Sequence, residues 1–208
     1  MNYKKIMAMG LIVSTITMTS HMKLYASYDA NAAVDYANRY AETPNNWDYH
    51  YFSGVDCTNF VSQCAIAGGA TMRNKAPNCY LKRIVIKDDE AWYHLYDGYH
   101  YLATQSWTVV DEFYQYWKKH SGATYSANCT IEQLKLIVKK GDIIQCARGS
   151  KFSHSVICTG NSNSKNSYDL SKITLAYHSN NKKNITLSEF NNNFDKTNAV
   201  TYRIIRFK

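Results

Sequence analysis

The sequence is poor in the residues that mark several protein classes. Only 2 of its 208 residues are proline and 9 are glycine, and charged residues make up 19% of the chain. Collagen-like, mucin-like and intrinsically disordered chains need more of these residues and fewer than the 45% hydrophobic residues found here, so those classes are excluded. The chain also lacks an internal repeat and a Pro- or Ser-rich linker, and its length suits a single domain.

Motifs for metal, nucleotide and nucleic-acid binding are missing as well. The sequence contains no C-x-x-C, H-x-x-x-H or H-E-x-x-H spacing, no Gly-rich phosphate loop and no dinucleotide fingerprint. Its lysines and arginines do not form the kind of run that follows a phosphate backbone. We therefore expect no metal ion, no other cofactor and no nucleic-acid partner.

Residues 1–26 have the pattern of a secretion signal. Lys4 and Lys5 form a basic start, and the mostly apolar stretch that follows is too short to cross a bilayer. Cleavage after Ala26 would leave residues 27–208 as one exported domain without stable membrane insertion; the alternative is an uncleaved anchor. Cleavage would remove three lysines and no acidic residue, so the net charge would fall from +8 to +5. A basic exported protein is attracted to an anionic cell envelope.

The order of the predicted elements favours an α+β fold. Helical spacing predicts helices over residues 30–43, between a cap at Asp56 and an exit at Gly68, over residues 109–120, and after a capping box at Thr130. Runs of Ile, Val, Thr and Tyr predict strands over residues 142–146, 155–159, 173–178 and 200–207. Helices followed by antiparallel strands indicate α+β, with N-terminal helices packed on a sheet. Residues 70–108 show no clear periodicity and form an aromatic-rich insertion.

Cys57 lies in the first turn of the second predicted helix. The positive end of the helix dipole and the free N–H groups there favour a thiolate, so we expect a lowered thiol pKa. The same N–H groups can stabilise an oxyanion during acyl transfer. Cys57 is therefore a candidate nucleophile; the alternative is that it is simply one of six cysteines, buried or in a disulfide.

Two of the seven histidines are placed to assist such a nucleophile. A cysteine nucleophile needs an imidazole within hydrogen-bonding reach. His154 immediately precedes one predicted strand and His178 ends the next. If the two strands are adjacent and antiparallel, both rings meet at one edge of the sheet and His178 can orient His154.

The block D-C-T-N-F-V-S-Q at residues 56–63 resembles the putative amidase domain of bacterial secreted proteins. That family belongs to the papain-like group, together with the NlpC-like and CHAP cell-wall peptidases. The likeness continues through G-D-I-I at residues 141–144, H-S-V-I at residues 154–157 and Y-H-S at residues 177–179, and it covers most of residues 28–190.

The resemblance implies a papain-like cysteine hydrolase core without a cofactor. Cys57 would be the nucleophile and His154 the general base. The third member would be a polar residue on the following strand, for which His178 matches NlpC-like relatives and Asn180 is the alternative. The motif residues Asp56 and Asn59 are interpreted as a helix cap and a local hydrogen-bonding residue, not as chemical groups.

The five other cysteines cannot all pair with one another, so at least one stays free. Cys64 and Cys158 lie within a predicted helix and a predicted strand and are interpreted as core residues. Cys79 with Cys129 is a conceivable disulfide, but the sequence does not determine connectivity.

Together these features predict a secreted cysteine amidase or peptidase, located outside the cell or at the cell wall. Its partner would be peptidoglycan or another amide-containing polymer, and we expect a monomer. Two alternatives use the same residues differently: a transamidase, in which an amine replaces water, and a catalytically inactive module that binds the envelope. A role as a toxin or in immune evasion, with a non-wall amide as substrate, also stays open.

Overall fold

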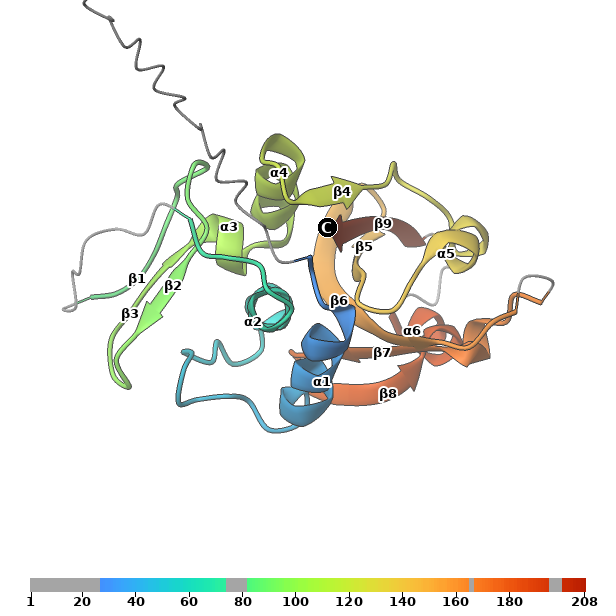
Figure 1. The fold of residues 1–208 in the computed structure, drawn as a ribbon, viewed down its shortest axis with the longest axis horizontal. Coiled ribbons are helices and arrows are strands. Elements are labelled where there is room, and N and C mark those ends of the chain that lie inside the picture. Colours follow the sequence, from blue (N-terminus) through green and yellow to red (C-terminus); the bar gives the residue numbers. More distant parts are fainter. Residues whose placement is uncertain (1–26, 74–81, 165–166, 195–199) are drawn as a thin grey trace, which may run out of the picture.

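A computed structural model describes residues 27–73, 82–164, 167–194 and 200–208. The predicted secretion signal over residues 1–26 lies outside this described part. The described residues form an α+β fold in which helices cover a large antiparallel sheet, and a small second sheet lies at one side (Figure 1). The predicted α+β class is therefore confirmed.

The large sheet is the centre of the molecule. Its strands lie in the order β4-β9-β5-β6-β7-β8, and all described pairs are antiparallel. Their bounds are Ala123–Tyr125 for β4, Ile143–Arg148 for β5, Lys151–Asn161 for β6, Ile173–Tyr177 for β7, Lys182–Thr186 for β8 and Val200–Phe207 for β9. Four of these strands were predicted; β4 and β8 were not, because they are short and rich in polar residues.

Alternating side chains of the sheet separate two hydrophobic clusters. Ile143 and Ile157 belong to the cluster on the side of α1 (Ala30–Tyr40), α2 (Cys57–Ala67) and α4 (Val110–Lys119). Their sequence neighbours Ile144 and Val156 belong to the cluster on the side of α5 (Ile131–Ile137) and α6 (Leu187–Phe194). Each residue of a central strand therefore faces one helical layer or the other, which decides where the site residues point.

The predicted helices are present, with small differences at their ends. Asp29 caps α1 by accepting from the backbone N–H groups of Asn31 and Ala32, and Thr130 and Gln133 form the expected capping box at α5. Helix α1 ends at Tyr40 rather than at residue 43. The Tyr40 carbonyl, at the end of this helix, accepts a hydrogen bond from a buried histidine ring. Helix α6 was not predicted, since three consecutive asparagines obscure its pattern.

Helix α2 is buried on almost every side. Nine of its 11 residues are buried, including the polar Thr58, Asn59, Ser62 and Gln63. The sequence predicted one apolar face, but the sheet, α1 and α3 (Gln105–Thr108) surround the helix. Its polar side chains are satisfied inside the protein: Ser62 donates to the Trp107 carbonyl at 2.9 Å, and the Gln63 side chain accepts from the Tyr36 hydroxyl at 2.8 Å. The helix that begins at Cys57 is therefore held from several directions.

The aromatic-rich insertion forms a small sheet beside α2. Strands β1 (Arg83–Ile86) and β3 (Tyr101–Thr104) are parallel, and β2 (His94–Tyr96) pairs with β3 in the antiparallel direction. Trp92 and Trp107 are fully buried, with ring centroids 4.5 Å apart, and join the core shared by α1, α2 and α4. The insertion is therefore packed onto the domain.

No helix in the described parts of the chain has the length and apolar character to cross a bilayer.

Candidate active site

Cys57 is the first residue of α2, and its side chain is 7% exposed. The sulfur lies 3.8 Å from the Thr58 hydroxyl. The backbone N–H groups of Ser155 and Thr58 and the side chain of Ser179 also contact the thiol, and these contacts favour its charged form. Burial outweighs them and raises the thiol pKa above its ordinary value. The expected lowering of the pKa is therefore wrong for this conformation, in which the thiol is neutral at pH 7.

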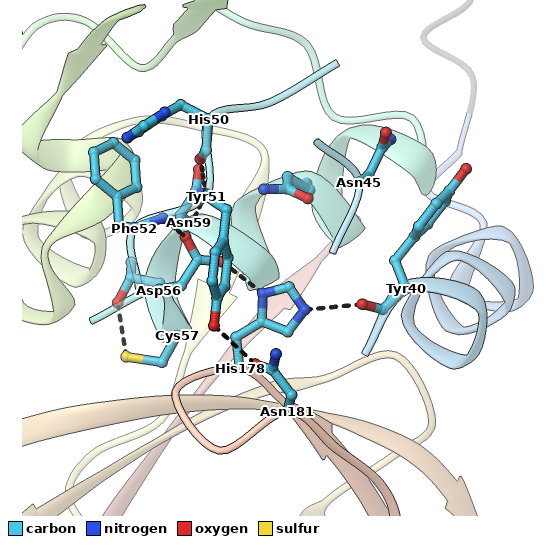
Figure 2. A network of polar contacts seen from close by, with 12 residues as sticks. Tyr40, Asn45, His50, Tyr51, Phe52, Asp56, Cys57, Asn59, His178 and Asn181 are labelled. Carbon is cyan, nitrogen blue, oxygen red and sulfur yellow. Dashed lines mark hydrogen bonds and ion pairs between the residues drawn. The ribbon is translucent and has the colours of Figure 1, made fainter. Parts of the chain in front are cut away.

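Asp56 occupies the N-cap position of α2, but its side chain makes no capping hydrogen bond. Its Oδ1 atom accepts from the Phe52 backbone N–H at 2.7 Å and from Asn59 Nδ2 at 2.8 Å. Its Oδ2 atom lies 2.5 Å from His178 Nδ1 (Figure 2). The interpretation of Asp56 as a helix cap is right in position and wrong in mechanism: the carboxylate joins the preceding loop to the sheet.

Asn59 connects the same loop with the aromatic-rich insertion. Its Nδ2 atom also donates to the His50 carbonyl at 2.9 Å (Figure 2), and its Oδ1 atom accepts from Trp107 Nε1 at 2.7 Å. The residue is fully buried with both ends of its amide bonded. Its interpretation as a local hydrogen-bonding residue is confirmed.

His178 lies between Asp56 and the end of α1, as Figure 2 shows. Its Nε2 atom donates to the Tyr40 carbonyl at 2.9 Å, and its ring stacks on Phe60 with centroids 4.0 Å apart. The side chain is fully buried, and both ring nitrogens are bonded. The prediction that His178 orients His154 is therefore wrong, because no ring nitrogen is left to do so.

His154 lies on β6, and its ring faces the other side of the sheet. The ring is packed among Tyr177, Phe190 and Phe194, with centroid distances of 5.2, 6.0 and 5.9 Å. Burial, followed by the charge of Arg148, lowers its pKa from 6.5 to about 4, so the imidazole is neutral at pH 7. In the described structure no hydrogen bond joins the ring to the Cys57 thiol.

The register of β6 and β7 explains why the two histidines separate. The strands are adjacent and antiparallel, as predicted, and Ile157 pairs with Ala176. Continued by two residues, this register places His178 opposite Ser155, whose hydroxyl contacts Thr58 of α2 at 3.1 Å. His154 is next to Ser155 and therefore faces the opposite layer. A shift of one position along the strand decides which histidine meets which helix.

A pocket of about 260 Å³ opens beside His154. Its lining comes from β5, β6, the end of β7 and α6, and consists of Arg148, Ser153, His154, Tyr177, Ser179, Asn180, Phe190, Asn193 and Phe194. Ser179 connects this pocket to Cys57, because its side chain also contacts the thiol. Asn180, the alternative third residue, shares the lining with His154.

The turn that carries Ser179 has an unusual backbone. Ser179 has φ 85° and Asn181 has φ 47°, in the left-handed region that residues other than glycine seldom adopt. The Tyr51 hydroxyl donates to the Asn181 side chain at 3.4 Å, which links the turn to the loop before Cys57 (Figure 2). Such strain persists where the surrounding structure holds it. Sequence reasoning named neither Ser179 nor Arg148; the match of Y-H-S to the family motif was the available signal for Ser179.

The described cysteines are all free thiols. Cys64 and Cys158 are fully buried, as predicted for core residues, and Cys146 is buried as well. Cys129 is partly buried, and Cys79, its conceivable disulfide partner, lies outside the described residues. Within the described ranges no three His, Cys, Asp or Glu side chains are grouped so that they could hold a metal ion.

Comparisons with known proteins identify a family and a relative. Residues 27–204 match the family described as a putative amidase domain. An uncharacterized protein of Bacillus subtilis (strain 168), YjcM, is 29% identical over an alignment of 180 residues that covers 82% of this chain. The aligned part is 34% of that relative, so the chain spans about a third of its length. No solved structure gives a significant match.

Proposed function

Because the chain belongs to the putative amidase domain family, we propose that it is a cysteine hydrolase that cleaves an amide bond. Family membership suggests amide hydrolysis, and the surroundings of Cys57 support a cysteine mechanism. One observation carries the cysteine mechanism. The thiol contacts the backbone N–H of Ser155, which follows His154 in the sequence, and it also contacts Ser179, which lines the pocket beside His154. Ser155 and Ser179 therefore link the candidate nucleophile to the pocket of the candidate base, whose ring faces the opposite layer of the sheet.

The ground state consists of a neutral thiol and a neutral imidazole. As the Cys57 sulfur attacks the substrate carbonyl, His154 accepts the thiol proton, and it then donates that proton to the leaving amine. Water, deprotonated by His154, hydrolyses the resulting thioester and restores the thiol. Because the His154 ring faces away from the thiol in this structure, the proposed mechanism requires substrate binding to bring the two groups together.

Two further groups complete the proposed mechanism. The Asp56 side chain does not cap α2, and apart from the Thr58 N–H, which contacts the thiol, the N–H groups of its first turn are proposed to face the oxyanion that forms on the substrate. Asn180 is the proposed third residue, since it lines the pocket with His154 while His178 is bonded elsewhere. The order of a helix-start cysteine, a strand histidine and a polar residue in the turn after the next strand supports a papain-like core.

The proposed substrate is an amide of an exported polymer, with peptidoglycan as the leading choice. The predicted signal and the basic charge support action at an anionic cell envelope. Polar side chains of Ser153, Asn180 and Asn193 line the pocket and admit water. Hydrolysis is therefore proposed in preference to amine transfer.

The test is to incubate residues 27–208 with purified sacculi under reducing conditions and to identify released fragments by mass spectrometry. We expect fragments with new amine and carboxylate ends, and these ends identify the bond that was cut. A panel of non-wall proteins and peptides, incubated in parallel, covers other amides. Release of no fragment from either source would contradict the proposed function.

The pH dependence of hydrolysis follows from the neutral imidazole. Because His154 acts as a base, activity falls as the pH drops through its pKa in the folded protein, which is lowered to about 4. The acid limb of kcat/KM is therefore expected near pH 4, and activity at about pH 5.5 should be close to its value at pH 7. A midpoint near 6.5, the ordinary histidine value, would contradict the buried environment of this ring.

Alkylation of Cys57 by iodoacetamide is the control for this assignment. The thiol pKa is raised above 9.0, so the alkylation rate should keep increasing as the pH rises beyond 9. A rate that is already constant at neutral pH would instead indicate a thiolate–imidazolium pair. The acid limb would then belong to the thiol and not to His154.

A further inference from the structure

Among the described residues that line the pocket beside His154, Arg148 is the only charged one. The other lining residues are neutral and polar or aromatic, and no carboxylate faces the guanidinium there. The positive charge of Arg148 interacts with His154, since it contributes to the lowered pKa of that ring. A positive group thus stands within electrostatic range of the proposed base without an acidic partner in the pocket.

The guanidinium is held in place from one side only. Its Nε atom donates to the Phe194 carbonyl at 2.7 Å, and its Cζ atom lies 4.5 Å from the centre of the Phe194 ring. Among the described residues Arg148 has no other hydrogen bond and no ion pair. Its terminal N–H groups are therefore free for a ligand, while α6 fixes the plane of the fork.

We propose that Arg148 binds a carboxylate of the substrate, so that the enzyme prefers amides in peptides with an acidic group close to the scissile bond. This specificity rests on the proposed amide hydrolysis. Guanidinium and carboxylate form paired, charge-assisted hydrogen bonds, and the pocket supplies amide donors from Asn180 and Asn193 beside them. Tyr177 and Phe190 provide an apolar surface for the rest of the substrate.

Binding to the Cys57→Ala protein tests the proposal without turnover. The probes are acetyl-Ala-Glu-Ala-amide, acetyl-Ala-Gln-Ala-amide and acetyl-Ala-Gln-Ala with a free C-terminal carboxylate. They separate a side-chain carboxylate from a terminal one. We expect at least one carboxylate probe to bind about tenfold more tightly than the fully amidated glutamine probe. Equal affinities of all three probes would overturn the proposal.

The variants are Arg148→Gln, Arg148→Lys and Lys151→Gln, each in the Cys57→Ala background. Lys151 pairs with Arg148 across the β5–β6 hairpin, is exposed and does not line the pocket, so it controls for the loss of one positive charge. Arg148→Gln should abolish the preference for a carboxylate, Arg148→Lys should keep part of it, and Lys151→Gln should leave it unchanged. Arg148 has only a structural role if Arg148→Lys loses the carboxylate preference as completely as Arg148→Gln does, and if both variants unfold at the same temperature, below that of the Cys57→Ala protein.

Turnover separates this proposal from the proposed function. These assays use protein that keeps Cys57 and the substrate identified in sacculi or in the peptide panel. In that protein Arg148→Gln should raise KM about tenfold for acidic substrates and less for their amidated forms. Hydrolysis with no such preference would reject the role of Arg148 and keep the amidase. A carboxylate preference in binding without any hydrolysis would reject the amidase and keep the binding site.

Discussion

Replacement of Cys57 by alanine is expected to reduce amide hydrolysis by roughly a thousandfold or more. The thiol is the proposed nucleophile that forms the covalent acyl intermediate, and without it water must attack the amide directly. The measurement is kcat/KM with the fragment-releasing substrate, for the wild type and for Cys57→Ala. Activity within tenfold of the wild type would reject the cysteine mechanism.

Cys64→Ala is the matched control for that experiment. Cys64 lies on the same helix and is fully buried, but its sulfur faces the hydrophobic core. Its replacement should leave kcat/KM within a few-fold of the wild type once both proteins are folded. If both variants lost activity equally, the loss would reflect a disturbed α2 rather than a missing nucleophile. Circular dichroism of each variant distinguishes these cases.

Replacement of His178 by leucine is expected to lower the free energy of unfolding by about 3–5 kcal/mol. The change removes the Nδ1 contact with Asp56 and the hydrogen bond to the Tyr40 carbonyl, and it leaves a fully buried carboxylate without its partner. Urea denaturation followed by far-UV circular dichroism measures this loss. A loss below about 1 kcal/mol would show that the buried pair does not hold the domain together.

The control is His100→Leu, which removes a histidine–aspartate contact at the surface. His100 Nδ1 lies 3.0 Å from Asp97 Oδ2, and both side chains are partly exposed. Exposed pairs contribute little, so the expected loss of stability is much smaller than that of the buried pair. The comparison isolates the effect of burial on the contribution of a histidine–aspartate contact to stability, because residue types and contact distances are similar in the two pairs.

A double-mutant cycle with Asp56→Asn measures the coupling of the buried pair. Asparagine keeps an acceptor for the Phe52 N–H but removes the charge that faces His178. The double variant should be more stable than the sum of the two single losses implies. Measured where both proteins are folded, kcat/KM of His178→Leu should fall far less than that of Cys57→Ala. A loss of activity without a loss of stability would restore His178 to the catalytic group.

Much of the fold could be predicted because its signals are local. The side chain of Asp29 and the box of Thr130 and Gln133 define the starts of α1 and α5 through contacts that span three residues. The β-branched runs of β5, β6 and β9 are equally visible in sequence. The small sheet over residues 83–104 was missed because its strands are short and its β1–β3 pair joins residues far apart in the chain.

The candidate site was predictable only in part. The position of Cys57 at a helix start follows from patterns within a dozen residues, whereas His154, expected just before a strand, lies within β6. The direction of a side chain on a strand depends on register, and a shift of one residue moves it to the other face. For this reason His178 meets Asp56 and Phe60, while His154 meets Phe190 and Phe194.

The sequence by itself determined the α+β class, the main helices and strands, and the cysteine that begins α2, because propensity, capping and periodicity act between near neighbours. Only the tertiary structure decided which histidine lies near which helix, that Ser179 and Arg148 belong to the site, and that the Cys57 pKa is raised. These properties arise from burial and from contacts between residues distant in the chain. Charge stabilisation at a helix start is local, whereas desolvation depends on everything packed around the group.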